Sequence, residues 1–168
     1  MVLSCSTDDS GGDPDNKSNF NYSVSGAASK TVTGDNARFG STGSFDQTFI
    51  SLKMDTDELE IRVVLDPIIL GTYEVNPVVI MDGGGQIINI PIEARDSWAD
   101  LGIGSTLSGD RRSFSTNSAN GGSVTITKVN DDVLEGTISV SMMELLSGND
   151  VFNNPKVTVQ GNFIAVKQ

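Results

Sequence analysis

Histidine is absent from this chain of 168 residues, and cysteine occurs once, at position 5. Histidine is the commonest general base near neutral pH and the commonest protein ligand of transition metals. A single cysteine forms no disulfide within the chain and supports no cysteine-rich zinc site. These absences remove the commonest routes to acid–base, thiol and zinc chemistry, so we expect no catalytic residue, no bound metal and no cofactor.

Long apolar runs and basic clusters are missing as well. No apolar run reaches the roughly 18 residues that a membrane-spanning helix needs. The chain has 11 basic and 22 acidic side chains, a formal net charge of −11. Four aspartates and one lysine lie before residue 19, which leaves −8 for the remaining residues. Such a surface repels nucleic acid, so we expect no nucleic-acid partner.

The residues around Cys5 are typical of the point where a bacterial lipoprotein signal meets the mature protein. Val2, Leu3 and Ser4 place apolar and small residues before the cysteine, as a lipobox does. Acyl chains on that thiol would bind a membrane by roughly 0.8 kcal/mol per buried methylene. A complete signal has an apolar segment of about 7–15 residues, so we interpret residues 1–4 as the remnant of a signal. The alternative is an ordinary thiol in a polar terminus.

An acidic, glycine-containing stretch follows the cysteine. Asp, Ser, Gly and Pro bury too little apolar surface to fold, so we expect residues 5–18 to be a disordered tether and residues 19–168 to form one β-domain. The segment 6–9 (STDD) resembles the surface-export signal of Bacteroidota lipoproteins. This resemblance implies the outer face of the outer membrane, with the lipid bilayer as a partner through lipidated Cys5.

Alternating apolar and polar side chains predict strands joined by turns. Residues 58–66 show the pattern most clearly, because Leu59, Ile61 and Val63 share one face while charged residues occupy the other. Similar patterns between Gly, Pro, Asn and Asp turn signals predict further strands over residues 48–54, 71–75, 86–93, 112–116, 123–129, 133–142 and 156–167.

The last three of these strands form a meander, in which Gly136 marks a bulge or a close approach. We expect one short helical turn within residues 94–101, capped near Asp96, and a long polar loop over residues 102–120 that contains the strand at residues 112–116. Many short strands at this spacing predict an all-β fold, namely an antiparallel β-sandwich or barrel-like single domain with at most one helical turn.

Short motifs lie on these predicted strands: 71–73 (GTY), 122–128 (GSVTITK), 134–140 (LEGTISV) and 156–163 (KVTVQGNF). Over residues 45–168 the chain resembles a family of small Bacteroidota lipoproteins in which similar strands close a β-domain. The motifs are features of β-hairpins. The family has no assigned activity and no catalytic residues, so the resemblance implies a fold and a location only.

Carboxylates around the only tryptophan form the one candidate ligand site. Glu93, Asp96 and Asp100 flank Trp98. Carboxylates beside an exposed aromatic ring bind sugars, and paired acids hydrolyse glycosides. A tryptophan in the core with acidic loop residues around it is the commoner arrangement, because a single tryptophan is usually largely buried.

Three functions fit these observations. The first is a lipid-anchored, cell-surface β-domain that acts through binding or structure and not through catalysis. The second is a glycan-binding or carbohydrate-active surface protein that uses Trp98, Asp96 and Glu93. The third is a pilus-like or surface assembly subunit with a protein partner, for which we expect the strand at residues 156–167 to be exposed to a neighbour.

Overall fold

Eleven strands and no helix make up the secondary structure of the computed structural model, which describes residues 17–42, 47–64, 66–76, 97–116, 120–145 and 154–168. The strands are β1 (Asn19–Gly26), β2 (Lys30–Gly34), β3 (Asn36–Ser41), β4 (Thr48–Met54), β5 (Asp57–Val63), β6 (Gly71–Val75), β7 (Trp98–Ile103), β8 (Arg112–Ser115), β9 (Gly122–Val129), β10 (Val133–Glu144) and β11 (Lys156–Lys167). This confirms the prediction of an all-β fold.

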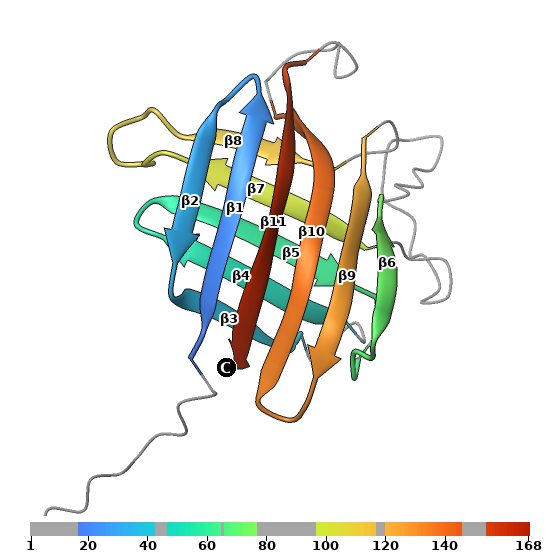
Figure 1. Ribbon diagram of the computed structural model, residues 1–168. Coiled ribbons are helices and arrows are strands. Elements are labelled where there is room, and N and C mark those ends of the chain that lie inside the picture. Colours follow the sequence, from blue (N-terminus) through green and yellow to red (C-terminus); the bar gives the residue numbers. More distant parts are fainter. Residues whose placement is uncertain (1–16, 43–46, 65, 77–96, 117–119, 146–153) are drawn as a thin grey trace, which may run out of the picture.

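The strands form two layers that pack face to face (Figure 1). The layer that we name the front sheet has the order β2-β1-β11-β10-β9-β6, and the back sheet has the order β3-β4-β5-β7-β8. In Figure 1 the strands of the back sheet run across those of the front sheet, as in an orthogonal sandwich.

Hydrogen bonds join the two layers at two corners. The last two residues of β11 pair in parallel with β3, where Val166 lies opposite Arg38. At the other corner the end of β10 pairs antiparallel with β8, where Glu144 lies opposite Phe114. A ring of strands therefore closes through β3, β4, β5, β7, β8, β10 and β11, while β1, β2, β9 and β6 extend the front sheet beyond it.

The predicted C-terminal meander is confirmed, because β9, β10 and β11 are consecutive antiparallel neighbours. The pairing of β10 with β9 shifts register between Glu135 and Gly136, so the irregularity predicted at this glycine is present. A Cβ atom on Gly136 would lie 2.5 Å from the carbonyl oxygen of Thr125 and 2.8 Å from the ring of Phe163. The absence of a side chain is what allows this approach.

The strands predicted over residues 48–54 and 58–66 are also confirmed, as β4 and β5, which pair in an antiparallel hairpin. Leu59, Ile61 and Val63 are completely buried, while the residues between them face outward, as the alternation indicates. Asp55 in the connecting turn has a φ of 52°, a left-handed conformation that aspartate tolerates better than most residues. Strands β6 and β8 likewise form where the sequence predicts strands.

The predicted helical turn at residues 94–101 is wrong in the part that the structure describes, because Trp98–Ile103 is strand β7. Strand β7 pairs with β5 on one side and β8 on the other, which supplies backbone hydrogen bonds that an isolated helical turn lacks. The polar loop is correspondingly shorter than the predicted 102–120. The strand predicted at 86–93 lies outside the described residues.

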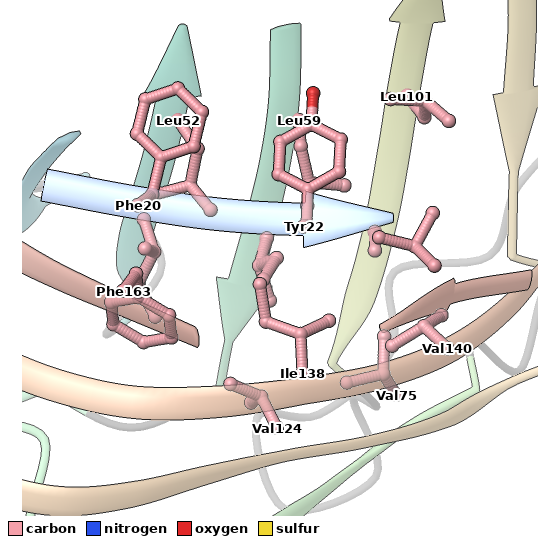
Figure 2. Close-up of a cluster of buried hydrophobic side chains, with 14 of the residues drawn as sticks. Phe20, Tyr22, Leu52, Leu59, Val75, Leu101, Val124, Ile138, Val140 and Phe163 are labelled. Atoms are coloured by element: carbon pink, nitrogen blue, oxygen red, sulfur yellow. The ribbon is translucent and has the colours of Figure 1, made fainter. Parts of the chain in front are cut away.

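The apolar core lies between the two sheets (Figure 2). Phe20 and Tyr22 of β1 and Phe163 of β11 come from the front sheet, and Leu52 and Leu59 come from the back sheet; all are at most 1% exposed. Each large apolar side chain buried in this way contributes about 1.5–3 kcal/mol. The core therefore holds the two sheets together and decides which positions of each strand face outward.

Tyr22 introduces a polar group into this core. Its hydroxyl has no hydrogen-bond partner within the part of the chain that the structure describes. Burial, and to a smaller extent the negative charge of Asp57, raises the pKa of Tyr22 far above its usual range. The ring stacks on Phe20 with 5.7 Å between ring centroids, so this side chain serves packing and stays protonated.

Candidate functional site

Two of the residues singled out from the sequence lie in the described part of the chain. These are Trp98 and Asp100, both on β7, whereas Cys5, Glu93 and Asp96 lie outside the described residues. The candidate site is therefore built around β7 and the strands beside it.

Trp98 lies on the outer face of the back sheet. Alternation along β7 turns Ala99 and Leu101 into the core and leaves Trp98 half-buried and Asp100 exposed on the opposite side. The expectation of a core tryptophan is wrong, because the inward positions of this strand are taken by the smaller apolar side chains. Trp98 is instead partly exposed on the outer face of the sheet.

A row of three large side chains crosses β4, β5 and β7. Phe49 lies opposite Arg62, and Arg62 lies opposite Trp98. The guanidinium carbon of Arg62 is 5.8 Å from the centroid of the Trp98 ring, a cation–π contact worth about 0.5–1 kcal/mol at a partly exposed site. This contact holds the guanidinium group of Arg62 against the Trp98 ring.

The adjacent row on the same face carries carboxylates. Glu60 of β5 lies directly opposite Asp100 of β7. Arg62 donates from Nε to Oε1 of Glu60 over 2.7 Å, so it partly neutralises one of these two neighbouring acids. We name Phe49, Glu60, Arg62, Trp98 and Asp100 the Trp98 patch.

The Trp98 patch combines an aromatic surface with hydrogen-bonding groups of both kinds. Arg62 offers N–H donors, and the carboxylates of Glu60 and Asp100 accept hydrogen bonds. Glu60 and Asp100 lie next to each other on one face of the sheet, where both carboxylates can accept hydrogen bonds from hydroxyl groups.

The sequence did not single out Phe49 or Arg62. A signal was present in β4, because Phe49 lies between the buried Thr48 and Ile50 and so points outward with the polar residues. An aromatic side chain on the solvent side of an alternating strand is unusual enough to mark a surface site. Only the pairing of β4, β5 and β7 shows that both side chains join Trp98.

Asp57 is buried at 4% exposure, whereas the neighbouring Asp55 is exposed and Glu58 is half-buried. It forms an ion pair with Lys30 of β2 and accepts a hydrogen bond from the backbone N–H of Gly104 over 3.1 Å. These contacts tie β5 to the front sheet and to the β7–β8 loop, so the role of Asp57 is structural. Among the described residues no group of three or more acidic or cysteine side chains is placed to hold a metal ion.

Comparison of the chain with protein-family models, curated protein sequences and solved structures gave no match. In the described ranges no helix is long and apolar enough to cross a membrane. Function is therefore inferred from the surfaces that the fold presents.

Proposed function

We propose that this protein is a lipid-anchored β-domain of the bacterial outer surface that acts by binding glycans without catalysis. The observation that carries the binding function is the outward position of Trp98 beside Arg62, with Glu60 and Asp100 in the next row. The anchor rests on Cys5 with its lipobox-like residues and on the acidic segment that follows.

Sugars suit the Trp98 patch because they are amphipathic. One face of a pyranose ring carries C–H groups that pack on an aromatic side chain, and its edge carries hydroxyl groups that both donate and accept hydrogen bonds. The half-buried Trp98 supplies the apolar surface. Arg62 and the exposed Asp100 supply a donor and an acceptor beside it, so one sugar residue can use both parts of the patch.

Replacing Trp98 with alanine is expected to weaken binding of short neutral oligosaccharides at least about tenfold, or about 1.4 kcal/mol, because the stacking surface is lost. Isothermal titration with a panel of such oligosaccharides measures the effect. Trp98→Phe should keep part of the affinity, and Ser113→Ala on the same outer face serves as the control. Equal affinity in wild type and Trp98→Ala, or no binding of any oligosaccharide, would refute glycan binding at this patch.

The lipid anchor has a separate test. Mass spectrometry of the protein from membranes of its native host is expected to show diacylglycerol on Cys5 at the mature N-terminus. Cys5→Ala should move the protein from the membrane fraction to the soluble fraction, because the acyl chains supply the attachment. An unmodified thiol with the upstream residues still in place would rule out the anchor.

Assembly through the final strand is not favoured by the fold. Strand β11 lies between β1 and β10 and also pairs with β3, so it is a central strand and not the exposed one that this function requires. The edges of the front sheet are β2 and β6, which are five residues long each.

A further inference from the structure

The outer face of the front sheet is almost free of charge. Its central row runs in register across six strands through Thr33, Asn21, Asn162, Thr137, Thr125 and Thr72. The adjacent row, through Ser23, Gln160 and Ser139, is likewise uncharged until it reaches Glu74 at the β6 edge. We name this surface the hydroxyl–amide face.

Charged groups lie at the margins of this face. Besides Glu74, the described outward positions near it include the ion pair of Lys128 and Glu135, which lies toward one end of β9 and β10. The whole chain carries a net charge of −11, so a broad uncharged surface is a departure from its average composition. Such a surface gives no electrostatic attraction to ionic ligands.

The side chains of the face repeat in two directions. Neighbouring strands are about 4.8 Å apart, and outward residues on one strand recur about every 6.7 Å. The strands that carry them lie side by side in Figure 1, and no described segment crosses them. The face is therefore a regular array of small hydrogen-bonding groups, which fits a ligand that also repeats.

Polar groups at the centre of the array are available to a ligand. Asn21, Asn162 and Thr137 are exposed, and none of them makes a side-chain hydrogen bond within the described residues. Toward the β6 edge the hydroxyls of Thr72 and Thr125 bond each other over 3.0 Å. The central amides and hydroxyl both donate and accept hydrogen bonds, as sugar hydroxyls do.

We propose that the hydroxyl–amide face binds extended neutral polysaccharide chains. This inference rests on the proposed function for the ligand class, but it assigns a different surface from the Trp98 patch. A neutral chain loses no ionic hydration on binding, and its sugar residues repeat at a length comparable to the strand spacing. Many weak hydrogen bonds made in parallel then replace the single aromatic contact of the Trp98 patch.

Co-sedimentation of the full chain with insoluble polysaccharides tests the proposal. The neutral probes are microcrystalline cellulose and starch granules, and the anionic probe is calcium alginate. We expect retention on at least one neutral probe and little on alginate. Thr137→Arg and Asn162→Asp should each reduce retention at least about tenfold, because they place bulk or charge in the centre of the array.

Matched variants distinguish binding at this face from binding at another surface. Thr106→Arg makes the same change on the exposed β7–β8 loop and should bind like wild type. Thermal unfolding checks that every variant folds. Retention that survives Thr137→Arg but is lost in Trp98→Ala would overturn this inference and support the Trp98 patch. Absence of retention on both neutral probes would also overturn it, as would self-association of wild type that Thr137→Arg abolishes.

Discussion

Gly136→Ala is expected to lower the free energy of unfolding by about 1–3 kcal/mol, the range for overpacking in a well-packed core. The new Cβ atom would lie 2.5 Å from the backbone oxygen of Thr125 and 2.8 Å from the Phe163 ring. Where alanine fits, removing a glycine usually stabilises a protein by about 0.4–1 kcal/mol through the unfolded chain. Here the sign reverses, because the backbone of β9 cannot move without opening its pairing with β10.

Urea unfolding of wild type and variant measures this effect. Thr137→Ala is the matched control, since it changes the next residue of β10 on the exposed side and should cost less than about 1 kcal/mol. A midpoint for Gly136→Ala equal to that of wild type would show that the β9–β10 pairing widens without cost, and would contradict a steric requirement for glycine at this position.

Strands with long alternation were predictable from the sequence alone. In β5 the alternation of Leu59, Ile61 and Val63 with charged residues fixes which face is buried, because side chains of a strand point to opposite sides in turn. In β10 the glycine at the bulge interrupts an otherwise regular pattern at the place where the register shifts. These features depend on neighbouring residues, which a sequence displays directly.

Strand β7 was not predictable on the same grounds. Only Trp98, Ala99, Asp100 and Leu101 precede Gly102 in this strand, and four residues of alternation fit a helical turn as well as a strand. Pairing with β5 and β8 decides the outcome, and those strands are distant in the chain. Strand β1 was missed although Phe20, Tyr22 and Val24 alternate with polar residues as regularly as the apolar residues of β5 do. The shorter β2 and β3 become strands through pairing with β1 and β4.

The candidate sites depend even more on long-range pairing. Phe49, Arg62 and Trp98 are far apart in the sequence and become one row only because β4, β5 and β7 are neighbours in this register. A shift of one residue would turn each side chain to the other face. The hydroxyl–amide face likewise combines strands from both ends of the chain, so its lack of charge cannot be recognised from the order of residues in the sequence.

The two outer faces of the sandwich therefore differ in chemistry. The back sheet presents aromatic rings and charges of both signs, whereas the front sheet presents uncharged amides and hydroxyls. Both faces depend on the corners that join the sheets. If the two layers moved relative to each other, the strands near the corners would change their pairing, and the side chains on both outer faces would move apart. The stability of these corners is thus a condition for both proposed surfaces.

At one corner Arg112 and Glu144 form a bidentate ion pair. Nε of Arg112 lies 2.7 Å from Oε1 of Glu144, and Nη2 lies 2.7 Å from Oε2. Arg112 also donates from Nη1 to the backbone oxygen of Ala27 over 2.9 Å, which adds the β1–β2 turn to the corner. The hydrogen bond from Arg112 holds the pKa of the Glu144 carboxyl below its usual range.

Glu144→Gln is expected to lower the free energy of unfolding at pH 7 by about 2 kcal/mol, the scale of hydrogen bonds to charged groups. Arg112 remains 37% exposed and can regain water, which keeps the cost below the 3–5 kcal/mol of a fully buried pair. Glu135→Gln is the control, because the Lys128–Glu135 pair is more exposed and should contribute less than about 1 kcal/mol.

The pH dependence of the free energy of unfolding tests whether the charge of Glu144 stabilises the corner. A carboxyl whose pKa is lower in the folded than in the unfolded chain stabilises the fold fully above its unfolded pKa, about 4.3 for glutamate, and loses that contribution as pH falls through the folded value. Urea unfolding at pH 7, 5 and 3 should therefore show wild type and Glu144→Gln converging in stability below about pH 4. A difference that stays constant from pH 7 to pH 3 would mean that packing of the side chain, and not its charge, secures the corner.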